Sequence, residues 1–277
     1  MSALKVHHLD CAHITAMSIG GRPLVCHVLL IETPSDGLVL VDTGLGTADY
    51  EDLSSRLGFS FAKLYARPAA EPARAALHQV RSLGFHPSDV RHVVQTHLDL
   101  DHVGGLSDFP WAAVHVHATE LEAAFRRKGL KARSRYRPPM WAHGPDFHTY
   151  RAHGERWHGF DAVRGLDGLP EQILMVPLPG HTLGHCGIAV DARDGWILDA
   201  GDAVFDRRQL DPTPTVGFHV GLFERIVTTD KARRLNSKAQ LRALVAGHPD
   251  LFVFAAHDPS GFPATTPHDR TVDAPAG

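Results

Sequence analysis

The chain lacks the cysteine pattern of a disulfide-rich or cysteine-ligated protein. Its 277 residues include only three cysteines, Cys11, Cys26 and Cys186, and none of them forms a CxxC pair. Three cysteines cannot all pair, which fits a reducing compartment better than a disulfide framework. We therefore expect small buried thiols at all three positions.

Long apolar runs and an excess of one charge are also absent. No uninterrupted apolar run reaches the ~20 residues that a bilayer-spanning helix needs, and the first residues resemble no signal-peptide core. The 28 Lys and Arg residues nearly balance 31 Asp and Glu residues, which leaves no electrostatic reason to expect nucleic acid. We expect a soluble, cytoplasmic protein that acts on a small molecule, with neither nucleic acid nor a membrane as partner.

A content of 43% hydrophobic residues over this length supports one large α/β domain. No internal repeat and no clear linker divide the chain, so we expect a single domain over residues 1–277. Residues 126–137 hold seven basic residues, and Pro and Gly recur after them, which favours an inserted loop region at about 126–165 over the site. The tail from about residue 260 is expected to be loosely packed.

Hydrophobic periodicity and turn residues predict alternating strands and helices. Two strands, 25–32 and 38–41, flank turn residues and should form a hairpin. The other expected strands are 90–95, 114–117, 173–176, 187–190, 196–198 and 251–256, and the expected helices are 71–84, 118–128 and 231–246.

Histidine is abundant, with 21 residues, and four metal-competent side chains fall within residues 97–102. This segment reads His97-Leu98-Asp99-Leu100-Asp101-His102, follows the apolar pair Val93-Val94, and precedes Gly104 and Gly105. Imidazole nitrogens mixed with carboxylate oxygens suit zinc, iron or manganese. In an extended segment the side chains at 97, 99 and 101 point to one side, so one loop can supply ligands to two metals.

Further metal-competent residues recur where expected strands end. They lie in the segments Val41-Asp42-Thr43-Gly44, Gly180-His181-Thr182-Leu183-Gly184-His185, Asp199-Ala200-Gly201-Asp202 and Ala255-Ala256-His257-Asp258. A GxSxG nucleophile motif is missing from the sequence, so serine catalysis of that type is not indicated. In this order, the five motifs resemble the metallo-β-lactamase fold superfamily of hydrolases over roughly residues 26–258.

The resemblance implies a four-layer αββα sandwich and two divalent metal ions. The family pattern assigns His97, Asp99 and His185 to the first metal, Asp101, His102 and His257 to the second, and Asp202 to a bridge between them. Asp42 and His181 would orient ligands without binding metal themselves. Burying so many polar groups without a metal would be costly.

The implied reaction is hydrolysis of an ester or lactone by a hydroxide that bridges two ions, most simply zinc. Asp202 would hold the bridge, and Asp101 could move a proton to the leaving group. The usual family motif has histidine where this chain has Asp99. An additional carboxylate should make the bound ions weaker Lewis acids, and it should make the site prefer harder metal ions, which favours manganese or iron as alternatives.

Chain length and the Gly-His-Thr-Leu-Gly-His form look most like the lactonase branch, which opens cyclic esters such as acyl-homoserine lactones. That branch often has a tyrosine where this chain has Phe205, and phenylalanine offers no hydroxyl to an oxyanion. Candidate pocket residues are Tyr136, Trp141, His143, His148, Phe205 and His219.

Two alternatives remain open. The first is a thioester hydrolase of the glyoxalase II kind, which shares the metal loop. The second is a non-hydrolytic, iron-binding redox or regulatory protein of the same fold. The aromatic residues of the 126–165 region also suggest a homodimer contact.

Overall fold

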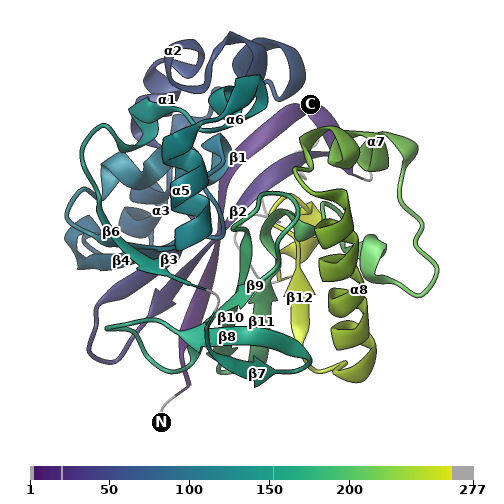
Figure 1. Cartoon of the computed structure of the whole chain (residues 1–277). Coiled ribbons are helices and arrows are strands. Elements are labelled where there is room, and N and C mark those ends of the chain that lie inside the picture. Colours follow the sequence, from purple (N-terminus) through teal and green to yellow (C-terminus); the bar gives the residue numbers. More distant parts are fainter. Residues whose placement is uncertain (1–2, 20, 152, 264–277) are drawn as a thin grey trace, which may run out of the picture.

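The computed structural model describes residues 3–19, 21–151 and 153–263, in which two mixed sheets pack face to face with helices outside them (Figure 1). The first sheet has the order β1 (Lys5–Ile19), β2 (Arg22–Glu32), β3 (Leu38–Val41), β4 (Val90–Val94), β5 (Ala113–His117) and β6 (Asp146–Tyr150). The second has the order β12 (Phe252–Phe254), β11 (Gly195–Asp199), β10 (Cys186–Ala192), β9 (Ile173–Pro177), β8 (Phe160–Gly165) and β7 (Glu155–Trp157). The expected tail lies mostly outside the described residues.

Three apolar cores account for the layers. The inner core joins residues of both sheets, such as Val41 and Val94 from the first and Ile188 and Val190 from the second. A second core covers the outer face of the first sheet, and a third lies between the second sheet and its helices. This arrangement is the expected αββα sandwich, because each sheet buries one face against the other and one against helices.

Helices flank the sandwich on both sides (Figure 1). Those packed near the first sheet are α1 (Thr47–Glu51), α2 (Leu53–Leu57), α3 (Ala76–Ser82), α4 (Leu100–Val103), α5 (Ala118–Arg126) and α6 (Gly129–Arg135). The remaining two are α7 (Phe218–Val227) and α8 (Lys231–Gly247). Among the described residues, no helix combines the length and apolar character needed to cross a membrane.

Most predicted elements are present within a few residues. The hairpin is confirmed, since β2 pairs antiparallel with β3. The helix expected at 71–84 is wrong at its start: Pro72–Arg74 form a separate 3-10 turn, and α3 begins only at Ala76. The long strand β1, α7 and a π-helical segment at Ser60–Tyr65 had no clear sequence signal.

Residues 126–165 do not form one loop over the site. β6 extends the first sheet by parallel pairing with β5, and β7 and β8 end the second sheet. The backbone of this region is satisfied by strand pairing, which the Pro and Gly residues between the strands do not prevent. Of residues 126–165, only those of α6 line the cavity described below.

Candidate metal centre

The five motifs meet at one edge of the sandwich because each follows a strand that ends there. Asp42 follows β3, the His97 segment follows β4, and His181 lies in the loop between β9 and β10. Asp202 follows β11, and His257 follows β12. Parallel pairing of β3 with β4 and of β11 with β12 brings equivalent strand ends together.

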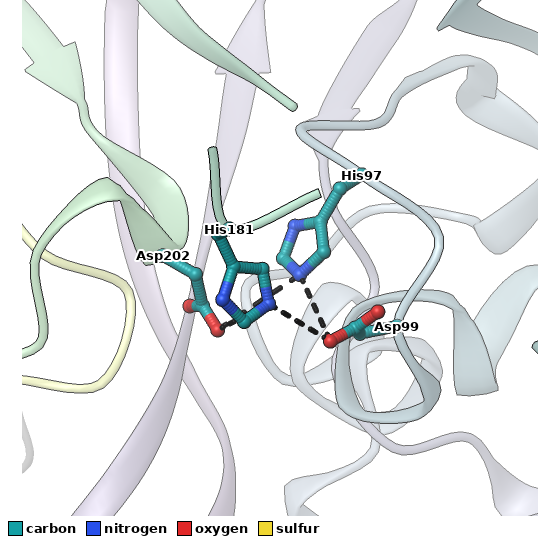
Figure 2. Close-up of side chains that lie close together, drawn as sticks. All are labelled: His97, Asp99, His181 and Asp202. Atoms are coloured by element: carbon teal, nitrogen blue, oxygen red, sulfur yellow. Dashed lines mark hydrogen bonds and ion pairs between the residues drawn. The ribbon is translucent and has the colours of Figure 1, made fainter. Parts of the chain in front are cut away.

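His97, Asp99, His181 and Asp202 form the first cluster (Figure 2), in which one potential ligand atom of each residue lies within 4.8 Å of the others. Asp99 Oδ2 lies 2.9 Å from His181 Nε2 and 3.5 Å from His97 Nε2. Asp202 Oδ2 lies 3.4 Å from His181 Nε2. The group has the mixed nitrogen and oxygen donors expected for a divalent ion.

His102, Asp202 and His257 form the second cluster, which shares Asp202 with the first. Asp202 Oδ1 lies 3.4 Å from His102 Nε2 and 3.2 Å from His257 Nε2. Asp101 joins through its Oδ2, 3.5 Å from His257 Nε2. Since the two oxygens of Asp202 face different clusters, this side chain lies where a bridging ligand would be needed.

The histidines are fixed so that one nitrogen of each faces the clusters. Asp42 accepts from His102 Nδ1 at 2.7 Å, and the Val25 carbonyl accepts from His257 Nδ1 at 2.6 Å. Such partners orient imidazole ligands in metal sites. The buried Nε2 of His97 has no hydrogen-bond partner, and neither has the Oδ1 of Asp202. Buried polar atoms that make no hydrogen bond are costly, and both atoms face other residues of the clusters, so their arrangement fits the binding of a metal ion.

Asp42, to which the family resemblance assigns an orienting role, contacts His102 of the second cluster. Its backbone has a φ of 58°, an uncommon conformation for a residue other than glycine. Thr96 holds its carboxylate through the backbone N–H at 2.8 Å and the hydroxyl at 2.7 Å. The oxygen that accepts from the Thr96 hydroxyl, Oδ2, also contacts His102 Nδ1, so Thr96 fixes the carboxylate that orients His102.

The structure reverses the expected roles of His181 and His185. Both nitrogens of His185 are engaged: Nδ1 donates to the Leu178 carbonyl at 3.0 Å, and Nε2 accepts from the Asp202 N–H at 2.9 Å. His185 therefore positions Asp202, whereas His181 presents Nε2 to the first cluster. Spacing alone could not separate two histidines four residues apart in one loop.

Neighbouring cationic side chains lower the pKa values of the two aspartates Asp99 and Asp202. Although burial raises the pKa of Asp202, neighbouring His257, His181 and His102 hold it well below its usual value. Burial likewise raises the pKa of Asp99, but Arg135, His97 and His181 outweigh it and keep this pKa well below its usual range. Both side chains are thus carboxylates, the state that binds cations.

Glu120 links the two loops that carry the first cluster, a role that sequence reasoning missed. Its Oε1 accepts from the Leu98 N–H at 3.1 Å, and its Oε2 accepts from the Gly184 N–H at 3.2 Å. A Cβ atom on Gly184 would lie 2.2 Å from the Glu120 nitrogen, so only glycine permits this approach. Glu120 also accepts from the Tyr136 hydroxyl at 3.0 Å.

A cavity of about 420 Å³ opens onto both clusters. Its lining includes Asp99, Asp101, His181, Asp202 and His257. Apolar walls come from β1, β2, the Ser60–Tyr65 segment and α7, and further polar lining comes from α6. The other lining residues are Ile14, Met17, Leu24, Phe61, Tyr65, Ala66, Leu100, Lys131, Ser134, Arg135, Phe205, Phe223, Ile226 and Val227. An apolar pocket with a few polar groups at one end is typical of a small-molecule site.

The expected pocket set is mostly wrong, because only Phe205 of the six candidates lines this cavity. The Tyr136 hydroxyl is occupied by Glu120, and His148 lies on β6 beside His115. Trp141 packs against Phe125, and His143 and His219 also lie outside the lining. Four of the six candidates lie in the 126–165 region, yet only α6 of that region reaches the cavity, and β6 to β8 extend the sheets instead.

The cysteines agree with the expectation of buried thiols, since all three are free and buried. Burial raises the pKa of the Cys26 thiol to about 11. Cys26 nevertheless lies with Asp101 and His257 in a group of potential ligands that no motif had marked.

Comparison with known proteins identifies the family of this chain. The family model for the Metallo-beta-lactamase superfamily matches residues 21–248. "Probable metallo-hydrolase Rv2300c" of Mycobacterium tuberculosis is 43% identical over 92% of this chain and 81% of its own length. The N-acyl homoserine lactonase of Bacillus cereus is 25% identical over 88% of this chain and 85% of its own length.

A solved variant of Bacillus thuringiensis AiiA, with N-decanoyl-L-homoserine at its active site, has the same fold. Its TM-score is 0.70 at 19% identity, over 94% of this chain and 95% of that one. The sequence relatives confirm the lactonase-like resemblance that the motifs suggested. Because the family model covers most of its length, this chain belongs to the metallo-beta-lactamase superfamily.

Proposed function

We propose that this metal-dependent hydrolase opens the ring of a lactone whose apolar substituent occupies the cavity beside the two clusters. The observation that carries the proposal is the direct opening of an apolar cavity onto both clusters. Relatives named N-acyl homoserine lactonases support the lactone as substrate.

The ligand assignment in this proposal follows the geometry. His97, Asp99 and His181 would hold one divalent ion, Asp101, His102 and His257 a second, and Asp202 would bridge them. Two ions held there would supply a hydroxide near neutral pH and polarise the scissile carbonyl. Zinc suits the donors, and the structural neighbour AidC is described as a dizinc lactonase; manganese and iron remain alternatives.

In this proposal Phe205 shapes the cavity wall and Asp101 transfers the proton. Phe205 stacks on His257, with ring centroids 5.6 Å apart and planes 7° from parallel, and closes one wall beside the second cluster. Asp101 lines the cavity next to His257, and its carboxylate could accept the proton that the attacking hydroxide gives up and pass it to the leaving alkoxide. Cytoplasmic location, a single domain and a homodimer stay predictions.

A hydrolysis screen tests the proposal. Metal-loaded protein should hydrolyse an N-acyl homoserine lactone with a higher kcat/KM than a glutathione thioester or an aryl ester, and a chelator should abolish the activity until metal is restored. Faster thioester hydrolysis would favour the glyoxalase II type. Bound iron with redox activity and no hydrolysis would favour the non-hydrolytic alternative.

Two lining residues of the cavity carry a hydroxyl, Tyr65 and Ser134, and we propose that Tyr65 replaces the tyrosine missing at Phe205. It lines the cavity with Asp99 and Asp101 and is 42% exposed. Burial and then these carboxylates raise the pKa of Tyr65, so the phenol stays protonated and can donate to an oxyanion. We expect Tyr65→Phe to lower kcat on the lactone by about 100-fold, the scale for losing one oxyanion donor.

Tyr50→Phe is the matched control, because the Tyr50 hydroxyl donates to the Cys11 carbonyl and lies outside the cavity lining. Equal effects of the two substitutions on kcat would show that Tyr65 has no role in the reaction.

A further inference from the structure

Arg135 is a buried cation directly beside the first cluster. Its side chain is only 8% exposed, and its Nη1 lies 3.4 Å from Asp99 Oδ1. Asp99 Oδ2 is the oxygen that faces His97 and His181. The two oxygens of Asp99 thus face opposite partners, the cluster on one side and a guanidinium on the other.

The position of this guanidinium is fixed by backbone carbonyls. Nη1 donates to the His181 carbonyl at 3.2 Å, and Nη2 donates to the Val227 carbonyl. These bonds connect the end of α6 to the loop of His181 and to α7. Arg135 therefore cannot swing into solvent without leaving two carbonyls, and its charge stays next to Asp99.

The contact between Arg135 and Asp99 changes the formal charge of the proposed metal centre. With Asp99, Asp101 and Asp202, the two clusters carry three carboxylates, and a hydroxide on two divalent ions would bring the formal charge of the centre to zero. Counting Arg135 returns it to plus one, the value that a neutral histidine at position 99 would give. In a buried site such a charge is weakly screened by salt.

Building on the proposed function, we infer that Arg135 is a positioning residue that neutralises the additional charge of Asp99, so that the pair Asp99–Arg135 replaces a neutral ligand at this position. The expected preference for harder metals on account of Asp99 alone is thereby reduced. The effects of substituting Arg135 and Asp99 on metal affinity should therefore not be additive.

Zinc affinity, measured by competition with a chromophoric chelator, tests the pair without using activity. Asp99→His leaves the Arg135 charge unbalanced and should weaken zinc binding by about tenfold or more. Adding Arg135→Met to Asp99→His should recover most of this loss. Arg135→Met alone should bind zinc at least as tightly as the wild type, because a repelling cation is gone.

Arg135→Lys in the Asp99→His background is the matched control. Lysine and methionine both lose the forked contacts to the carbonyls, but only lysine keeps the charge. Rescue by methionine and not by lysine is the expected result, with far-UV circular dichroism showing that all variants are folded.

Two other outcomes overturn the inference in distinguishable ways. If Arg135→Met weakens zinc binding alone and worsens Asp99→His, Arg135 serves only to anchor the loops, and the proposed metal site stands. If the wild type binds no divalent metal, the proposed centre fails and the pair fails with it.

Discussion

The His181→Ala variant is expected to lose about one metal ion per chain and at least about 100-fold in kcat/KM. His181 presents Nε2 to Asp99 and Asp202 in the first cluster, and replacing a ligand should cost more than the 10- to 100-fold typical of an outer partner. Metal content by elemental analysis and lactone hydrolysis at saturating zinc measure the two losses.

His185→Ala is the matched comparison, since both histidines are buried in the same loop. It leaves the Leu178 carbonyl and the Asp202 N–H without their partner, so we expect lower thermal stability and weaker zinc affinity. At saturating zinc it should still bind the wild-type number of ions. Loss of an ion from His185→Ala, with none from His181→Ala, would restore the assignment made from the family pattern.

A second large effect is expected from Glu224→Gln, which should lower the free energy of unfolding by about 3 kcal/mol. Glu224 lies on α7 with a side chain only 5% exposed, and its Oε1 pairs with Lys238 at 2.5 Å and with Arg234, both on α8. Glutamine would leave two buried cations without a counter-charge. Chemical denaturation near pH 7 measures the change.

The destabilisation should depend on pH. Burial raises the pKa of Glu224, but Lys238 and Arg234 outweigh it and hold this pKa below its usual value. Because the pKa of Glu224 is lower in the folded state than in the unfolded state, its ionisation stabilises the fold fully at a pH above the unfolded pKa of about 4.5. This stabilisation is lost as the pH falls through the folded pKa. The difference between wild type and Glu224→Gln should therefore shrink as the pH falls below about 4.5.

Glu122→Gln provides the control for the glutamate substitution. Glu122 pairs with Arg126 and Arg151, but its side chain is 44% exposed. An exposed pair contributes little, so the change should stay within about 0.5 kcal/mol. Similar losses from both substitutions would mean that the Glu224 contacts do not couple α7 to α8.

α7 also connects stability to the cavity. Its residues Phe223, Ile226 and Val227 form part of the wall, and Arg135 binds the Val227 carbonyl. We expect Glu224→Gln to raise KM for an apolar lactone more than it lowers kcat, because α7 forms part of the cavity wall, whereas the residues of the two clusters lie on other segments.

Local sequence patterns were enough to predict the family, the sandwich and most of the candidate ligands, because each motif follows an expected strand and the motifs come in the order typical of the family. The candidate ligands His97, Asp99, Asp101, His102, Asp202 and His257, and Asp42 as an orienting residue, could therefore be named before any contact was known. The choice between His181 and His185 required the contacts of the folded chain, because it depends on which imidazole binds the Leu178 carbonyl and the Asp202 N–H. The tertiary structure also decided the cavity wall and the partner of Asp99, since Tyr65 and Arg135 reach the site through packing between segments far apart in sequence, which no local pattern records.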